Sequence, residues 1–562
     1  MKKYYYLLAT LVIWMGGCGG GGASSSSTPQ QSVSYTNVEA LKFDISTKKI
    51  DSNTQDSIVF DGSKSYITKT FTSSSSFNID SKISSDIYVV LTNAKSISPS
   101  QDSLSNKILK TTSYAKVVDF RKNFNKYLIK EGNLSSFIYQ RRAKSVGDSR
   151  IFYLDTQGVR ITKTKLKLRR TVYTKFGNKT LNIYVSDDSF DDGSGCPKYY
   201  CVNQDMVDTL GDKFLKKGLD NDIYDWETNI YGEEWGDEAS KKFPNLIGKT
   251  DEITILLTDI DNDNEPKEGA IGYFFAKDNM TDMEGSNKEI MFYIDSVMYA
   301  NQGNVDFWDT TEKMPMEVIS TLAHEFQHMI SFYQKSILRG GGKPTSTWLD
   351  ETMSCATEYL LSSKIKTRTP REVSYEDGSA GTSPISQGFF PVFNKYINDY
   401  TLTNWSSSPQ QYGGAYAFGA YILQNYGGAK LLHNIMHNSY LDYNAILEGI
   451  RLSTNQTVSF EKLFNDCGVA ILASNKILDP VTDKPYIFNT GNWNCQNYED
   501  SIYCMGSINF FNYYPAPNTT TIDNGILYSN SNRYIYLKYN VLGSYNIYLN
   551  LGEGVIATVL IK

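Results

Sequence analysis

The sequence predicts an α+β protein in which a mixed region of strands and helices lies between two β-rich regions. Strand-like and helix-like segments alternate between about residues 181 and 475, which is typical of a mixed β-sheet packed against helices. On either side, short runs rich in Tyr and Ile are divided by Gly, Asn and Ser, as in strands joined by turns. The chain also has 41 Tyr but only 15 Pro among its 562 residues, which favours β-structure.

The composition argues against nucleic acid as a partner and leaves few histidines for catalysis or metal binding. Lys and Arg total 55 against 61 Asp and Glu, so the net charge is −6 and no basic excess points to nucleic acid. Hydrophobic residues make up 40% of the chain, which is ordinary for a soluble globular protein. Any histidine-based chemistry must come from only four residues, which are His324, His328, His433 and His437.

Residues 1–17 are predicted to be a lipoprotein signal peptide. Two lysines precede an apolar run that is too short to anchor the chain in a bilayer, and small residues lead from it to Cys18. This arrangement resembles the bacterial lipobox, although Met15 stands where Leu is usual. We therefore expect a lipid on Cys18; the alternative is an ordinary secretory signal with an incidental cysteine.

Residues 18–32 are rich in Gly and Ser and are predicted to form a flexible tether. A lipid and a tether would place the protein in the bacterial cell envelope or on the cell surface, held to a membrane, the outer membrane in a Gram-negative cell. Export also permits disulfides, and the local pairs Cys196–Cys201 and Cys495–Cys504 are favoured. Cys355 and Cys467 either pair or stay as small buried residues.

The rest of the chain divides into three expected domains. A β-rich N-terminal domain spans 33–165 and includes strands near 87–91 and 150–154 and one helix near 120–129. A central domain spans 166–478, and a β-rich C-terminal domain spans 479–562. The segments expected within the last two are strands at 181–185, 253–257, 289–294, 534–539 and 545–549, a helix at 204–231, and several helices between 315 and 475.

The residues with the clearest chemistry lie at 320–330, which read STLAHEFQHMI. Pro315 is well placed to begin a helix, on which His324 and His328 are one turn apart and project from one face. Two imidazoles so placed can bind one Zn²⁺ per chain, and Glu325 can take a proton from a water on that metal. The alternative is a helix with two histidines that bind no metal.

A catalytic zinc usually has three protein ligands, and the third is expected in the segment WLDETMSCATEYL at 348–360. Glu351 lies 23 positions after His328, and the Gly-rich turn at 340–342 lets the chain reverse between them. Asp350 is the rival third ligand. Glu358 falls two turns after Glu351, where it could hydrogen-bond a zinc-binding histidine.

These segments resemble the zinc site of the gluzincin metallopeptidases, and most closely the hyicolysin-type family of exported bacterial proteases. Further similarity lies in the segments NIYGEEW at 229–235, GAIGYF at 269–274 and SNKEIMFYID at 286–295. Thr352 departs from the family, which often has Gly after the ligand Glu. The resemblance implies a thermolysin-like zincin fold for 166–478, Glu351 as the third ligand, and cleavage of protein or peptide substrates outside the cytoplasm.

Two further expectations concern the reaction. Tyr412 resembles the leading Tyr of a gluzincin aminopeptidase segment that donates a hydrogen bond to the oxyanion, although a packing Tyr is the alternative. The segment at 269–272 lacks the Glu with which aminopeptidases hold a free amine, so an endopeptidase is favoured. The strand at 289–294 is expected to be the edge strand that holds an extended peptide.

Weaker signals allow other readings. His433 and His437 have the same spacing but no adjacent Glu and no evident third ligand, so a surface helix face is expected. The oxygen-rich run Asp259–Glu265 could bind Ca²⁺, or could be a solvated turn. A surface-binding adhesin lipoprotein on a metal-binding zincin scaffold is the rival function. The intact Glu325 argues against it, because loss of the general base commonly marks an inactive relative.

Overall fold

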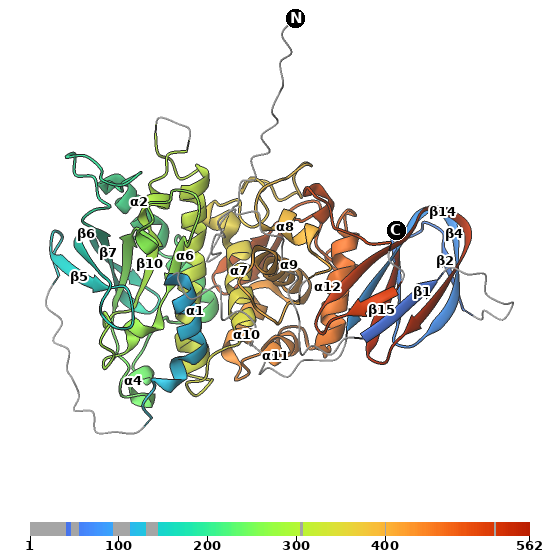
Figure 1. Ribbon diagram of the computed structural model, residues 1–562, viewed down its shortest axis with the longest axis horizontal. Helices are drawn as coiled ribbons and strands as arrows, with labels where there is room; N and C mark the ends of the chain where they lie inside the picture. The colour runs from blue at the N-terminus through green and yellow to red at the C-terminus, as the bar shows by residue number, and fades with distance from the viewer. Residues whose placement is uncertain are drawn as a thin grey trace, which may run out of the picture.

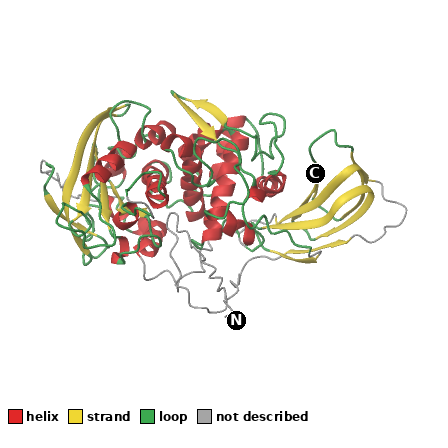
Figure 2. Ribbon diagram, turned by 90° about the horizontal axis from the view of Figure 1, so that it is seen from above, coloured by secondary structure: helices red, strands yellow, loops and turns green. Residues whose placement is uncertain are grey.

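The computed structural model describes residues 41–46, 56–93, 113–130, 144–303, 307–399, 401–521 and 524–562. The signal peptide, Cys18 and the tether lie outside these residues, so their assignments stay predictions. The molecule is elongated, with a β-sheet at each end and a layer of helices between them (Figures 1 and 2). This arrangement of sheets and helices confirms the α+β class.

A six-stranded mixed sheet lies at one end, in the order β5-β6-β7-β8-β10-β9. The contacts of β8 with β7 and with β10 are parallel, and the other pairs are antiparallel. Its strands are β5 (Ser149–Tyr153), β6 (Ile161–Thr174), β7 (Gly177–Ser186), β8 (Glu252–Thr258), β9 (Gly272–Phe274) and β10 (Met291–Asp295). The expected edge strand at 289–294 is therefore wrong: β10 is paired on both sides, and the short β9 is the edge.

The sheet at the other end has seven strands and joins the beginning and the end of the described chain. Its order is β13-β1-β14-β4-β15-β3, and β2 pairs with β4. The strands are β1 (Leu41–Ser46), β2 (Asp56–Phe60), β3 (Ile67–Phe71), β4 (Ser75–Asn93), β13 (Asn524–Leu527), β14 (Asn532–Leu551) and β15 (Val555–Ile561).

This pairing differs from the expectation of two separate flanking β domains. The strands expected at 534–539 and 545–549 form one long strand, β14, which pairs with β4 through several register shifts. Strand β5 and the start of β6, expected in the N-terminal region, belong to the sheet of the central region. Alternating apolar residues predict that a strand exists but not which distant strand it pairs with.

The central layer consists mostly of helices. Those described are α2 (Gln204–Phe214), α3 (Ile223–Tyr231), α4 (Glu238–Lys242), α5 (Ser296–Tyr299), α6 (Lys313–Ser331), α7 (Thr347–Ile365), α8 (Phe389–Lys395), α9 (Pro409–Tyr426), α10 (Gly428–His437), α11 (Tyr443–Thr454) and α12 (Phe460–Ala473). The single helix expected at 204–231 is instead two helices. Gly218 has φ +104° between them, and the Asp222 side chain accepts a hydrogen bond from the Asp225 amide, which begins α3.

One more helix, α1 (Ser113–Asn123), lies far from the β-strands that precede it in sequence. It contacts β9 at the edge of the six-stranded sheet and overlaps α6 in the view of Figure 1. Ring contacts hold it there, with centroid distances of 5.3 Å between Phe120 and Phe275 and 4.9 Å between Phe124 and Phe332. The helix expected at 120–129 therefore begins seven residues earlier and belongs to the central part of the molecule.

Two disulfides confirm the favoured local pairs. Cys196–Cys201 closes a short loop, and Cys495–Cys504 joins the hairpin strands β11 (Asn494–Tyr498) and β12 (Ser501–Met505). Cys355 and Cys467 are both buried.

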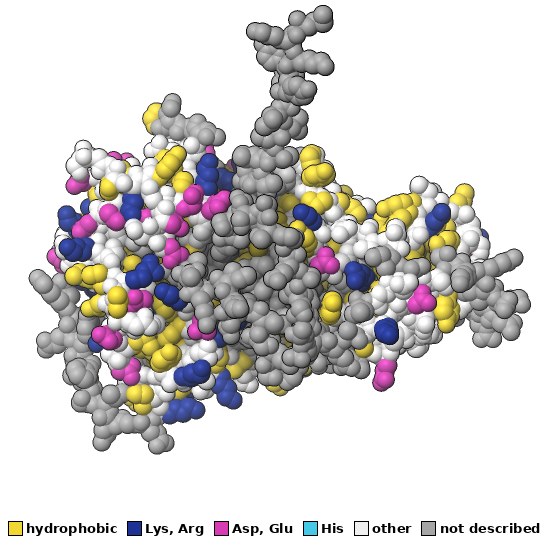
Figure 3. Space-filling view, viewed as in Figure 1, with side chains coloured by type: hydrophobic (Ala, Val, Ile, Leu, Met, Phe, Trp, Pro, Cys, Tyr) yellow, Lys and Arg dark blue, Asp and Glu magenta, His cyan; other side chains and the backbone are white. Residues whose placement is uncertain are grey.

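Two further features concern membrane-spanning helices and the distribution of charge on the surface. Among the described residues, no helix combines the length and the apolar character needed to cross a membrane. On the face drawn in Figure 3, basic and acidic side chains are interspersed among the described residues. That distribution agrees with the nearly balanced charge of the sequence.

Candidate metal centre

Helix α6 carries two histidines into the interior between the six-stranded sheet and the helical layer. Almost all of its residues are buried, because apolar side chains such as Val318, Leu322 and Phe326 face the sheet and neighbouring helices. His324 and His328 lie on one face with ring centroids 4.7 Å apart, and both are buried. The segment expected to be a helix is therefore one, and its two imidazoles meet.

Helix α7 brings Glu351 to these imidazoles. Its Oε2 lies 3.3 Å from His324 Nε2 and 3.6 Å from His328 Nε2, and all three ligand atoms lie within 4.8 Å of one another. Tetrahedral zinc with bonds of about 2.1 Å separates neighbouring ligand atoms by roughly 3.4 Å. The two oxygen–nitrogen separations and the donor set therefore fit a zinc ion held by His324, His328 and Glu351.

Each histidine is oriented by a second carboxylate. Glu358 Oε1 lies 2.7 Å from His324 Nδ1, and Asp350 Oδ2 lies 3.0 Å from His328 Nδ1. A Nδ1–H that donates to a carboxylate leaves the Nε2 lone pair free for a metal. Glu358 thus lies where the sequence placed it. Helix α7 begins at Thr347 after Ser346, and the side chain of Asp350 in its first turn faces His328.

Hydroxyl groups fix these carboxylates. Ser320 Oγ donates to Glu358 Oε2 over 2.5 Å, and the Tyr416 hydroxyl donates to Glu358 Oε1 over 2.6 Å. Ser331 Oγ donates to Asp350 Oδ1 over 2.8 Å. Sequence reasoning missed all three donors. Ser320 could have been found, because it lies four residues before His324 on the same helix face.

Glu325 is held beside the edge strand of the sheet. Its carboxylate is buried, and Oε2 accepts a hydrogen bond of 2.8 Å from the Phe274 amide of β9. The backbone donor fixes one oxygen of the candidate base near the metal ligands. The Glu325 carboxylate, a possible proton acceptor, therefore lies beside β9, the edge strand with which an extended chain could pair.

Comparison with known proteins agrees with this geometry. A model of the family described as peptidase M30 matches residues 161–482, more than half of the chain. The chain belongs to the peptidase M30 family.

A curated relative of this family member is the neutral metalloprotease ShpI of Staphylococcus hyicus, which is 25% identical over 262 residues. The match covers 45% of this chain and 55% of the relative, so the chain spans about half the length of the relative it matches. An M1 zinc metallopeptidase from Deinococcus radiodurans is 9% identical, with a TM-score of 0.22, over 74% of this chain and 63% of that chain. A mutant of that enzyme is 8% identical, with a TM-score of 0.23, over 74% of this chain and 63% of that chain. Scores this low do not establish a shared fold.

In this M30 family member, Tyr412 lies in a buried aromatic region. Helix α9 carries both Tyr412 and Tyr416, and both are buried. The Tyr412 ring lies 5.0 Å from Trp405 and 5.6 Å from Phe389, centroid to centroid. Tyr416, one turn later, is the residue whose hydroxyl reaches Glu358. The role of Tyr412 as an oxyanion donor stays a prediction.

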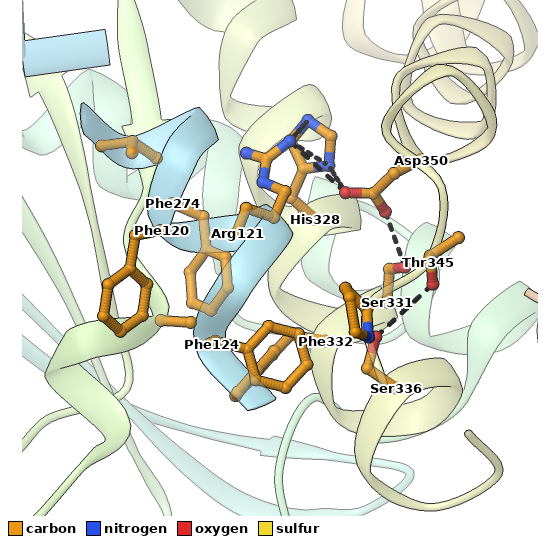
Figure 4. Close-up of a pocket in the computed structure, with 13 residues that line it drawn as sticks. Phe120, Arg121, Phe124, Phe274, His328, Ser331, Phe332, Ser336, Thr345 and Asp350 are labelled. Atoms are coloured by element: carbon orange, nitrogen blue, oxygen red, sulfur yellow. Dashed lines mark hydrogen bonds and ion pairs between the residues drawn. The ribbon is translucent and has the colours of Figure 1, made fainter. Parts of the chain in front are cut away.

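A positive side chain that the sequence did not indicate reaches the metal centre from α1. Arg121 NH1 lies 2.9 Å from Glu351 Oε1, 3.2 Å from His328 Nε2 and 3.3 Å from Asp350 Oδ2. Figure 4 shows Arg121 pointing from α1 toward His328 and Asp350, beside a small cavity whose lining includes four phenylalanines.

The charges in this cluster control one another. Burial and Arg121 lower the pKa of His328, but Asp350 and Glu351 outweigh them, so the net pKa is raised. Burial alone would raise the pKa of Glu351, but His328, His324 and Arg121 hold it well below its ordinary value. Glu351 is therefore ionised and ready to bind a cation at neutral pH.

The second histidine pair and the oxygen-rich loop have protein partners of their own. His433 and His437 on α10 are half-buried rather than on an open surface, and their Nδ1 atoms lie 2.8 Å from backbone oxygens of Ile230 and His433. In the loop, Lys198 Nζ lies 2.8 Å from Asp259 Oδ2 and 2.7 Å from Asn262 Oδ1. Calcium at this loop stays a prediction.

Proposed function

We propose that the chain is a zinc-dependent endopeptidase whose region 166–478 has a thermolysin-like zincin fold. The observation that carries this proposal is the convergence of two histidine Nε2 atoms on one Glu351 carboxylate oxygen. Glu325 lies one residue beyond His324 and is fixed against β9. The family membership and the metalloprotease relative support the same activity.

A zinc ion held by His324, His328 and Glu351 would supply an acidified water and polarise the scissile carbonyl. Glu325 would accept the proton of that water and pass it to the departing amine. Glu358 and Asp350 would keep the imidazoles oriented and would spread the positive charge that develops on them. Tyr412 remains our candidate for the donor to the oxyanion.

The substrate would bind as an extended strand along β9. This strand is the last of its sheet, and its Phe274 amide donates to Glu325 rather than to β10. A peptide laid along this edge would have its backbone next to the candidate base. We favour an endopeptidase because the neighbouring segment at 269–272 has no carboxylate to hold a free amino terminus. The substrates would be proteins or peptides outside the cytoplasm.

The test compares the wild type with Glu325→Gln and, as a matched control, Glu238→Gln on the exposed helix α4. Glu325→Gln removes only the proton acceptor, so it should keep one zinc per chain and lose about 100- to 10,000-fold in hydrolysis of casein. Glu238→Gln should leave both measurements unchanged. Equal hydrolysis by wild type and Glu325→Gln would remove the assignment.

We also propose that a lipid on Cys18 holds the enzyme on the cell envelope. The motif before Cys18 and the Gly/Ser tether after it support this location. Cells grown with a labelled fatty acid should give a labelled wild-type protein and an unlabelled Cys18→Ala variant. Label in both variants would return the segment to an ordinary signal.

A further inference from the structure

We propose that α1 is a built-in inhibitor of the metal centre and that Arg121 competes with the metal ion for Glu351 and His328. This inference rests on the proposed function, because it assumes that a metal ion binds at His324, His328 and Glu351. It assigns a role to a helix that precedes the matched family region of 161–482.

The first argument is the position of the guanidinium. Arg121 NH1 lies within 3.3 Å of Glu351 Oε1, His328 Nε2 and Asp350 Oδ2. A zinc ion would use His328 Nε2 and a Glu351 oxygen at about 2.1 Å. Arg121 contacts Glu351 Oε1, whereas Oε2 faces the two Nε2 atoms, and NH1 lies 3.4 Å from His328 Nδ1 as well as 3.2 Å from Nε2. The two cations would therefore lie against the same carboxylate and the same imidazole, where their like charges repel each other at close range. This repulsion is the competition that we propose.

The second argument is that Arg121 is held there by a docked helix. Val117 and Phe120 of α1 are buried, and so is Phe124, which directly follows α1. Phe124 packs edge-on against Phe332, which directly follows α6, and Phe120 packs against Phe275, which directly follows β9. The apolar contacts therefore anchor α1 on both sides of Arg121 (Figure 4).

The third argument is that α1 lies where the substrate would lie. It contacts β9, the edge strand whose Phe274 amide binds Glu325. The cavity beside His328 is lined jointly by α1, β9 and α6, including Phe120, Phe274 and Ser331. A helix in contact with β9 would compete with an extended peptide for the space beside this edge. Docked α1 therefore opposes both metal and substrate, and both should favour its release.

As an energetic consequence, the free energy of metal binding should be linked to the free energy of α1 docking. The Arg121 side chain is only 13% exposed and Glu351 only 1%, so their ion pair lies in a poorly screened setting. Removing the arginine leaves the buried carboxylate without this partner, and a zinc ion then gains more by binding it. By reciprocity, zinc should weaken the docking of α1 by the same factor.

The main experiment measures zinc affinity of the full chain by competition with a chromophoric chelator. Arg121→Ala should bind zinc at least about tenfold more tightly than wild type, which corresponds to about 1.4 kcal/mol. The control Lys116→Ala removes a positive charge from an exposed position of the same helix and should match wild type. Equal or weaker zinc binding by Arg121→Ala overturns the proposal.

Two further measurements separate competition from a merely structural role. Phe124→Ala should loosen α1 without changing a metal ligand, so it should also tighten zinc binding. The unfolding temperature shows whether this variant is folded. Unchanged zinc affinity in a folded Phe124→Ala protein would contradict a docked inhibitor. In wild type, zinc should speed amide hydrogen exchange across residues 113–126. Slower exchange would instead make α1 a permanent part of a metal-bound enzyme and overturn the proposal.

The same variants separate this proposal from the proposed function. In a Glu325→Gln background, Arg121→Ala should still tighten zinc binding although hydrolysis is lost. If wild type binds zinc and hydrolyses casein but Arg121→Ala shows no gain in affinity, the inhibitor fails and the enzyme stands. If neither protein binds zinc, both proposals fail.

Discussion

The two histidine pairs have identical spacing but opposite surroundings. His324 and His328 face three carboxylates from α7, two of which fix their Nδ1 atoms. The rings of His433 and His437 stack at 4.0 Å, and their Nδ1 atoms lie beside backbone oxygens. Helical spacing brings two imidazoles together in both cases, but among the described residues only the first pair has a carboxylate placed opposite both Nε2 atoms.

The electrostatic difference is equally clear. Burial, His433 and Arg339 lower the pKa of His437 to about 4, so this pair lies among groups that disfavour positive charge. Lys335 adds a buried amine nearby, and burial, followed by Arg339, lowers its pKa to about 7. A divalent ion would meet repulsion at the second pair and anionic ligands at the first. The pattern of neighbouring charges, more than the spacing, distinguishes a metal site.

The largest expected contrast is in zinc binding by the two pairs. His328→Ala removes a direct ligand and should weaken zinc binding beyond the roughly 100-fold loss typical of an outer partner. His437→Ala, the matched change in the second pair, should keep one zinc per chain with wild-type affinity. Zinc content after dialysis against a weak chelator measures both. Full zinc in His328→Ala, or loss in His437→Ala, would reverse the comparison.

A smaller effect is expected from the carboxylates that distinguish the first pair. Glu351→Ala should behave like a lost ligand, whereas Glu358→Ala and Asp350→Ala should each weaken zinc binding by about 10- to 100-fold, because each frees one Nδ1. Parallel zinc titrations give the ranking. A larger loss for Asp350→Ala than for Glu351→Ala would show that the neighbouring aspartate is the ligand.

The second pair should affect stability rather than metal binding. Because the folded pKa of His437 is about 4 and lies below its ordinary 6.5, the unfolded chain binds the proton more readily. Its contribution to stability is full above about pH 6.5 and is lost as the pH falls toward 4, by at most about 1.4 kcal/mol per pH unit and less for a half-buried ring.

His437→Gln should therefore lose less stability than wild type between pH 7 and pH 4.5. The free energy of unfolding in urea at the two pH values measures the difference, and Lys430→Gln on the same helix is the control. A steeper loss in His437→Gln than in wild type would contradict the depressed pKa.

The smallest effect concerns the cation beside the second pair. Arg339→Gln should raise the pKa of His437 only slightly, because burial and His433 contribute more to its depression than Arg339 does. Ring signals in NMR can follow this titration, since the chain has only four histidines. Arg451→Gln, on the exposed side of α11, should leave the pKa unchanged. A lower pKa in Arg339→Gln would show that its charge does not act on this ring.

The sequence predicted the parts of the site that depend on local geometry. His324, Glu325 and His328 follow from helical spacing, and Glu351 with Glu358 follows from the same spacing on the next helix together with the family resemblance. Contacts between distant segments were missed: Tyr416 reaches Glu358, and Arg121 reaches Glu351 across 230 positions. No periodicity in either segment encodes such a meeting.

The fold shows the same division. Strands at 87–91, 181–185 and 253–257 follow from their apolar runs, and the structure contains them in β4, β7 and β8. The edge strand was misplaced because β9 has only three residues and gives too short a pattern to detect. The prediction of one helix at 204–231 was wrong because the helical spacing of apolar residues continues across the break at Gly218.

The seven-stranded sheet also has a consequence for how the chain folds during synthesis. Strand β4 lies between β14 and β15, so it cannot complete its pairing until more than 400 further residues have been made. Until then its buried residues, Ile87 to Leu91, remain an apolar strand with open edges, which is an aggregation hazard. Such long-range pairing also slows folding. The nascent chain should therefore depend on protection by chaperones during synthesis far more than its metal-binding region alone would.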